Sequence, residues 1–254
     1  MIARFPDLAG RVAVVTGASR GIGAGTAAFL ASGGMAVALV ARGKDALDEV
    51  RERIWDAGGR AMVMPADVTD PDALTDAAAQ IEAELGPVDV LAAFAGGAGA
   101  PKPSLQMSLD DWNATVNADL TATFATIRTF VPGMVARGRG SVITMSSAAG
   151  RLPSRANVAY AAAKAGVAML TRHLALELGP SGVRLNCLAP SAVHNEKMDA
   201  FMKPAQMAEL GATFPLGRIG EPIDIAAATA FFASDASGWI TGTTLDVSGG
   251  KVIL

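Results

Sequence analysis

The stretch Val12–Gly23, VAVVTGASRGIG, decides the fold that we expect of this chain. An apolar, β-branched run ends at Thr16, and the glycines Gly17, Gly21 and Gly23 follow where a helix should begin. Glycines permit a sharp turn, and they leave the backbone N–H groups at a helix N-terminus open to a phosphate. Three glycines can also serve a plain turn. The stretch therefore predicts a strand, a loop able to hold a pyrophosphate, and a helix.

The rest of the chain alternates short apolar runs with longer helical patterns, which is typical of a parallel sheet buried on both faces. We expect strands at Arg11–Val15, Ala36–Ala41, Ala61–Met64, Val88–Ala93, Ser141–Ser146, Val183–Ala189 and Thr243–Val247, and helices that start near Gly21, Asp45, Asp72, Leu109, Asn157 and Pro222. At 254 residues with 51% hydrophobic content, the chain fits one domain, residues 1–254. The fold class is therefore α/β, a doubly wound, parallel, seven-stranded sheet.

Composition argues against several classes of partner. The formal net charge of −3 gives no reason to expect nucleic acid or an anionic membrane. One cysteine, Cys187, excludes an internal disulfide and fits a reducing compartment, and the start MIARFPDLAG lacks the basic and apolar regions of a secretory signal. No apolar run approaches the roughly 18 residues of a membrane span. We expect a cytoplasmic protein without a membrane partner or a metal site.

The single tyrosine, Tyr160, stands four residues before Lys164. On a helix the two side chains share one face, one turn apart. A tyrosine of ordinary pKa, about 10, is nearly inert at neutral pH, and a neighbouring ammonium favours the phenolate. The pair can be incidental on an alanine-rich helix. Its alternative interpretation is a catalytic acid–base beside its activator.

The end of the second strand bears on the choice of dinucleotide. An acidic residue there would bind the adenosine ribose diol and repel a 2′-phosphate, but the chain has Ala41 and Arg42. Arg20, in the glycine loop, adds a second guanidinium. Both arginines can be solvated surface residues, or they can bind the 2′-phosphate of NADP(H) and make NAD(H) the poorer cofactor. Asp67 can accept from the adenine amino group or cap the following helix.

These features together resemble the classical short-chain dehydrogenase/reductase family over essentially the whole chain. The motifs are TGASRGIG from Thr16, NADL from Asn117, SSAAGRLPSRANVAY ending at Tyr160, Lys164, and PLGRIGEP followed by ITGTTLDVSGG. The resemblance implies a Rossmann-like domain, a hydride exchanged between the nicotinamide and a carbonyl or secondary alcohol, and assembly as a homotetramer. The core and terminal motifs are similar to those of 3-oxoacyl-carrier-protein reductases, but the same motifs serve steroid, sugar and xenobiotic reductases, so the substrate stays open.

The resemblance also implies roles for particular residues. Tyr160 would exchange the proton, Ser147 would polarise the substrate oxygen, Lys164 would bind the nicotinamide ribose, and Asn117 would hold a proton-relaying water. Ser147 is preferred over Ser146 because it stands thirteen residues before Tyr160. The implied cofactor-binding residues are Gly17, Ser19, Arg20, Gly21, Ile22, Gly23, Arg42, Asp67, Val68, Ala95, Gly96, Tyr160, Lys164, Pro190, Val193 and Asn195.

Two departures from the family pattern are visible. The usual NNAG after the fourth strand reads Ala93, Phe94, Ala95, Gly96, which removes two amide side chains and puts an aromatic ring near the adenosine half of the cofactor. After the sixth strand, the usual Pro-Gly turn and its threonine become Pro190, Ser191 and Asn195. We expect weaker local order or cofactor affinity at the first place. At the second, the Asn195 amide would replace the threonine hydroxyl.

The substrate crevice should be framed by residues 97–107 and by a mobile lid over about residues 192–214, because loops beyond strand carboxyl ends border it. The lid segment contains the apolar residues Met198, Phe201, Met202, Met207, Leu210 and Phe214. An amphipathic helix packed on the body would show the same pattern. We expect an NADP(H)-dependent oxidoreductase of carbonyls and secondary alcohols. The alternative is a non-catalytic dinucleotide-binding sensor or structural protein.

Overall fold

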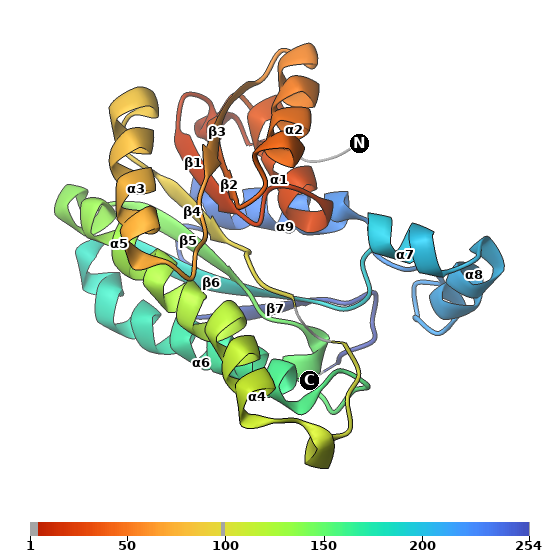
Figure 1. Ribbon diagram of the computed structural model, residues 1–254. Coiled ribbons are helices and arrows are strands. Elements are labelled where there is room, and N and C mark those ends of the chain that lie inside the picture. Colours follow the sequence, from red (N-terminus) through yellow and green to blue (C-terminus); the bar gives the residue numbers. More distant parts are fainter. Residues whose placement is uncertain (1–4, 98–99, 254) are drawn as a thin grey trace.

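The computed structural model describes residues 5–97 and 100–253. Its centre is a seven-stranded sheet in the order β3-β2-β1-β4-β5-β6-β7, and every neighbouring pair is parallel (Figure 1). The strands are β1 Val12–Thr16, β2 Ala36–Ala41, β3 Arg60–Pro65, β4 Val90–Ala93, β5 Gly140–Met145, β6 Val183–Pro190 and β7 Thr244–Val247. The expected Rossmann-like α/β fold is confirmed. The chain crosses from β3 to β4 beside β1, so a crevice opens at the carboxyl ends of β1 and β4.

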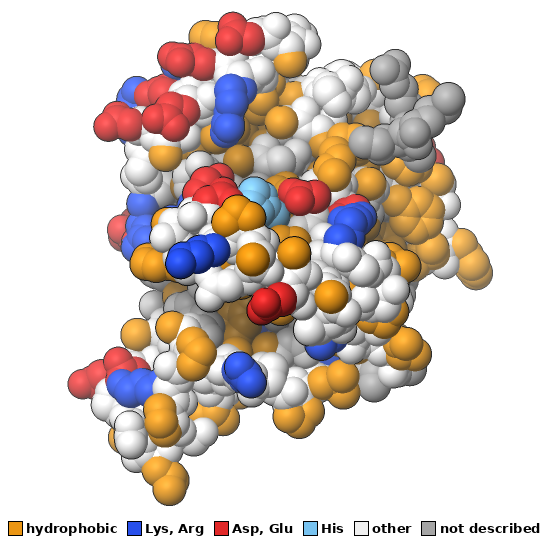
Figure 2. All heavy atoms as spheres, turned by 90° about the vertical axis from the view of Figure 1, so that its right-hand side faces the viewer, with side chains coloured by type: hydrophobic (Ala, Val, Ile, Leu, Met, Phe, Trp, Pro, Cys, Tyr) orange, Lys and Arg blue, Asp and Glu red, His pale blue; other side chains and the backbone are white. Residues whose placement is uncertain are grey.

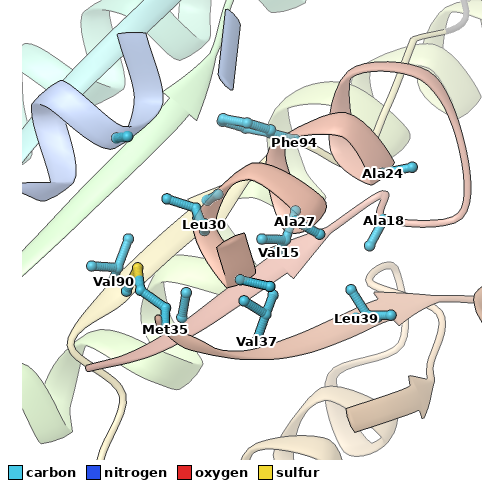
Figure 3. Packing of buried hydrophobic residues seen from close by; sticks show 14 of the residues in the cluster. Val15, Ala18, Ala24, Ala27, Leu30, Met35, Val37, Leu39, Val90 and Phe94 are labelled. Carbon is cyan, nitrogen blue, oxygen red and sulfur yellow. The ribbon is translucent and has the colours of Figure 1, made fainter. Parts of the chain in front are cut away.

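Helices cover both faces of the sheet (Figure 1). One face holds α1 Gly21–Ser32, α2 Lys44–Asp56 and α9 Pro222–Ala233, and the other holds α3 Pro71–Leu85, α4 Leu109–Val116, α5 Ala122–Arg137 and α6 Val158–Leu178. Alternate residues of β1 serve the two faces: Ala13 and Val15 join the cluster under α1, and Val12 and Val14 join the cluster under α5. Figure 3 shows part of the first cluster, with Val15 and Leu30 within it. Burial on both faces explains why the strands are apolar throughout.

Two regions differ from the simple alternation of strand and helix. The helix expected from near Leu109 is interrupted, because a π-helical segment, Asn117–Thr121, separates α4 from α5. After β6, the expected lid segment forms α7 Glu196–Phe201 and α8 Pro204–Ala212, which project from the body (Figure 1). Phe214 ends this segment and is buried. Within the described ranges, no helix has both the length and the apolar content to cross a membrane.

Candidate active site

In the loop between β1 and α1, two of the glycines stand where a side chain would not fit without a shift of the backbone. A Cβ on Gly17, whose φ is +70°, would lie 3.1 Å from the Cα of Ala95, and one on Gly23 would lie 2.2 Å from the carbonyl oxygen of Gly17. At the start of α1, the Gly21 N–H donates to a carboxylate oxygen of Glu196 at 3.4 Å. That carboxylate stands where a phosphate oxygen would bind a helix N-terminus. The loop therefore fits the pyrophosphate of a dinucleotide.

A cleft of about 410 Å³ lies beside this helix N-terminus, between α1, α2 and the start of α7. His194 and Glu196 line it, and His194 contacts Asp199 at 2.8 Å and Glu221 at 3.6 Å. The hydrogen bond to Asp199, followed by the charges of the nearby carboxylates, raises the pKa of His194. Figure 2 shows this side of the molecule, where acidic, basic and hydrophobic side chains are mixed. His194 thus links Asp199, on α7, to Glu221, which stands at the start of α9 on the body.

Arg42 and Asp67 follow the ends of β2 and β3, where we expect the adenosine half of the dinucleotide. Arg20 and Arg42 are exposed, and neither has an ion-pair partner among the described residues. Hydrogen bonds from the backbone and hydroxyl of Thr69 lower the pKa of Asp67, and the charge of Arg42 adds to this effect. Asp67 and Arg42 therefore act on each other across the ends of neighbouring strands. Ala66, before Asp67, donates to the carbonyl of Ala41 at 3.0 Å.

The end of β4 is held differently from our expectation. The hydroxyl oxygen of Thr16 accepts from the N–H groups of Phe94 and Ala95, at 3.0 and 3.1 Å. Phe94 is buried, and its ring belongs to the hydrophobic cluster with Ala24 and Val193 (Figure 3). The ring is therefore part of the core, beside the glycine loop, where a Cβ on Gly17 would lie 3.2 Å from the backbone carbon of Phe94. Its nearness to the adenosine stays a prediction. Through these two bonds Thr16 ties the end of β4 to β1, which is the task of the asparagine side chains in the usual NNAG.

Tyr160 and Lys164 lie one turn apart near the start of α6, as expected. The Lys164 ammonium is 5.6 Å from the centre of the Tyr160 ring and donates to the carbonyl of Met145 at 3.0 Å. The structure also separates the two serines after β5. Ser146 is buried and donates to the carbonyl of Lys164 at 2.7 Å, whereas Ser147 is partly exposed and accepts from the N–H of Ala149. Of the two serines, Ser147 is thus the one whose hydroxyl is accessible to a substrate at the end of β5.

The loop after Ser147 lies directly on α6. A Cβ on Gly150 would be 2.6 Å from the backbone carbon of Lys164. Ser147, Tyr160 and Lys164 are therefore brought to one edge of the sheet, around the carboxyl end of β5. This edge can hold a carbonyl oxygen beside a phenol and a hydroxyl, with an ammonium behind them.

Asn117 is not part of this group. Its side chain is exposed, and the residue that meets Lys164 is Asp119, whose carboxylate is fully buried and 2.9 Å from the ammonium. The same oxygen of Asp119 accepts from the N–H of Gly97 at 2.7 Å. The expectation for Asn117 is wrong because the π-helical segment turns Asp119, and not Asn117, toward α6.

The burial of the neighbouring residues agrees with the placement of Asp119 against Lys164. Asp119 lies four residues from Thr115 and from Thr123, and all three are buried, while Asn113 and Asn117 are exposed. A spacing of four places residues on one helix face. Gly96, at φ +133°, also belongs to the site, because a Cβ there would lie 2.3 Å from the Asp119 carboxylate.

The end of β6 contributes mainly backbone. Pro190 ends the strand, and Val193 is buried and pairs with Gly220. The Asn195 amide donates to the carbonyl of Val193 at 2.9 Å, and its oxygen accepts from the N–H of Met198 at 3.3 Å. Asn195 thereby caps α7, and its Cβ lies near Gly21, where a Cβ would be 3.7 Å away.

Comparisons with known proteins show the family of this chain. A family model described as enoyl-(acyl carrier protein) reductase matches residues 17–251. The cis-4-hydroxycyclohexanecarboxylate dehydrogenase of Sinomonas cyclohexanicum is 39% identical over 243 residues, covering 94% of this chain and 96% of that protein. The 3beta-hydroxysteroid dehydrogenase 1 of Eggerthella lenta is 37% identical over 255 residues, covering 98% and 96%.

A solved structure gives the same result. The crystal structure of an NAD(P)-dependent gluconate 5-dehydrogenase from Beutenbergia cavernae, described with bound NADP at low occupancy, superposes with a TM-score of 0.89. It is 37% identical, and the match covers 96% of this chain and 98% of that one. The chain therefore belongs to the classical short-chain dehydrogenase/reductase family.

Proposed function

We propose that this protein is an NADP(H)-dependent oxidoreductase that interconverts a secondary alcohol and its carbonyl, with Tyr160 as general acid–base. Family membership makes it a hydride-transfer oxidoreductase of alcohols and carbonyls. The role of Tyr160 as general acid–base is supported by its place beside Lys164 at the carboxyl end of β5, where the ammonium lies 5.6 Å from the centre of the Tyr160 ring. The glycine loop and the carboxyl ends of the strands supply the other proposed contacts to the dinucleotide.

The residues divide the chemistry between them. The dinucleotide, when bound, supplies or accepts the hydride. In reduction, Tyr160 donates a proton to the substrate oxygen, and Ser147 donates a hydrogen bond to that oxygen. Lys164 binds ribose hydroxyls and places a positive charge near the phenol. Residues Gly17, Gly21 and Gly23 hold the pyrophosphate.

The substrate class that we propose is a small carbonyl compound or its alcohol, and ring ketones are the first candidates. The names of the two curated relatives describe a secondary hydroxyl on a cyclohexane or steroid ring. Their chains and this one match over more than nine tenths of their length. Carrier-bound 3-oxoacyl groups are the second class to test.

The choice of NADP(H) depends on Arg20 and Arg42. Both guanidinium groups are exposed, and the residue directly after β2 is Arg42 in place of an acidic residue that would repel a 2′-phosphate. Replacing both by alanine should weaken NADPH by about a hundredfold and NADH by less than about threefold. Arg60→Ala removes the same charge from the exposed start of β3, at the opposite edge of the sheet, and should leave both affinities unchanged. Equal losses of NADPH and NADH in the double variant would contradict the assignment of the 2′-phosphate pocket.

The first experiment is a fluorescence titration with NADPH and with NADH, followed by turnover assays on ring ketones, open-chain ketones, aldehydes and 3-oxoacyl thioesters. Tight NADPH binding with turnover of one class establishes the oxidoreductase. Binding without turnover on the whole panel supports the alternative, a dinucleotide-binding sensor. Absence of binding contradicts both.

We also propose a homotetramer in the cytoplasm. Exposed apolar side chains on α4, α5 and α6, such as Leu109, Phe124 and Met169, offer a surface for a second copy. The one cysteine of the sequence, Cys187, is buried and free, which fits a reducing compartment.

A further inference from the structure

The Lys164 ammonium forms a buried ion pair with the carboxylate of Asp119. Its nitrogen lies 2.9 Å from Asp119, and both side chains are almost completely buried. Water screens a buried pair poorly, so each charge acts strongly on its neighbours. The nearest neighbour with a proton to exchange is Tyr160, whose ring centre is 5.6 Å from the ammonium.

The other ionisable groups around this pair contribute little net charge. Cys187, on β6, interacts with Lys164, but burial raises the pKa of its thiol and keeps it neutral. Arg151, beyond Ser147, interacts with Cys187 and is paired with both oxygens of Asp246, at 3.0 and 3.1 Å. The charge that opposes Lys164 is therefore that of Asp119.

We propose that Asp119 is a positioning residue whose negative charge offsets Lys164 and keeps Tyr160 in its phenol form to higher pH than a neutral side chain at this place would. The inference rests on the proposed role of Tyr160 as acid–base. A phenol that stays protonated at neutral pH is ready to donate its proton to a carbonyl. The carboxylate thus suits the site to reduction at neutral pH and moves oxidation toward alkaline pH.

Asp119→Asn is a suitable variant because it removes the charge and little else. One carboxylate oxygen accepts both from Gly97 and from Lys164, and an amide oxygen can accept the same two bonds. The second oxygen is buried and has no hydrogen-bond partner within the described part of the chain. The amide nitrogen of asparagine would take its place.

The experiment is an absorbance titration of the phenolate. Tyr160 is the one tyrosine of the sequence, so the near-ultraviolet change with pH reports its ionisation alone. We expect the midpoint of Asp119→Asn to lie about one pH unit or more below that of the parent protein. Asp110→Asn removes an exposed charge from the same helix region and should leave the midpoint unchanged. Tyr160→Phe should remove the transition and so assign it.

An unchanged or higher midpoint in Asp119→Asn would overturn the inference. If this variant does not fold, as judged by circular dichroism, Asp119→Ser removes the same charge and must lower the midpoint equally. The titration needs no turnover, so it stands apart from a failure to find a substrate. Once a substrate is known, the acid limb of the pH–rate profile for oxidation should move with the titration midpoint.

Discussion

At the scale of the residue, the site depends on a few side chains whose neighbours determine their chemistry. Ser146 and Ser147 are adjacent and chemically identical, yet the first is bonded to the α6 backbone and the second faces the open edge. Asp119 and Asn117 are two positions apart, and the buried one meets Lys164. A residue's type states what it can do, and its surroundings select one role.

Tyr160→Phe is the sharpest residue-scale prediction. The variant keeps the ring and loses the proton donor, so turnover should fall by about 10²–10⁴-fold. NADPH affinity should stay within about twofold of the parent value, as measured by fluorescence titration. Turnover at the parent rate would remove Tyr160 from the acid role.

Glu196 should compete with the dinucleotide for the start of α1. Its carboxylate accepts from the Gly21 N–H, where the pyrophosphate is expected. Glu196→Gln keeps the size and removes the negative charge, so NADPH should bind about two- to fivefold more tightly. Glu209→Gln, an exposed position on α8, is the control and should change nothing. Equal affinities of the Glu196 variant and the parent protein would contradict this competition.

At the scale of the element, α7 and α8 are joined to the body by charges and by one buried ring. His194 contacts Asp199 and Glu221, and Phe214 fixes the other end of the segment. The sequence predicted an apolar lid here, and the structure gives two short helices. Whether this segment moves stays a prediction.

The attachment of α7 should depend on pH. The hydrogen bond to Asp199 raises the pKa of His194 in the folded protein, so the stabilisation is fully present below the ordinary histidine value of about 6.5 and is lost as pH rises through the folded value. Hydrogen-exchange protection of Glu196–Phe201 should therefore fall from mildly acidic to mildly alkaline pH. In His194→Gln the protection should be independent of pH over this window. The same pH dependence in the variant would exclude His194 as its source.

At the scale of the whole molecule, the sheet brings six loops to one edge. The loops after β1, β2, β3, β4, β5 and β6 contain the glycine motif, both arginines, Asp67, Gly96, Ser147 and Asn195. Parallel strands place all carboxyl ends together, so residues far apart in sequence share one crevice. The opposite face of α5 and α6 is left with exposed apolar side chains.

That exposed face should be covered by a second copy. Light scattering should give a tetramer for the parent protein, and Phe124→Asp with Met169→Asp should give smaller species, because two charges would be buried in the contact. Both side chains are about half exposed in the single chain, so the folded subunit should tolerate the change. Trp55→Asp, an exposed position on α2, should leave the assembly intact. A parent protein that is monomeric would contradict the proposal.

The sequence by itself determined the strands, the glycine loop and the Tyr160–Lys164 pair, because each depends on local spacing. Strands buried on both faces must be apolar, and an interval of four residues fixes a shared helix face. These features need no knowledge of distant contacts.

Only the tertiary structure decided that Asp119 meets Lys164, that Thr16 ties the end of β4, and that Phe94 fills the core. Each of these contacts joins segments from different elements, and a π-helical segment changes which side chain faces inward. Local periodicity does not encode such contacts, because packing of the folded chain determines them.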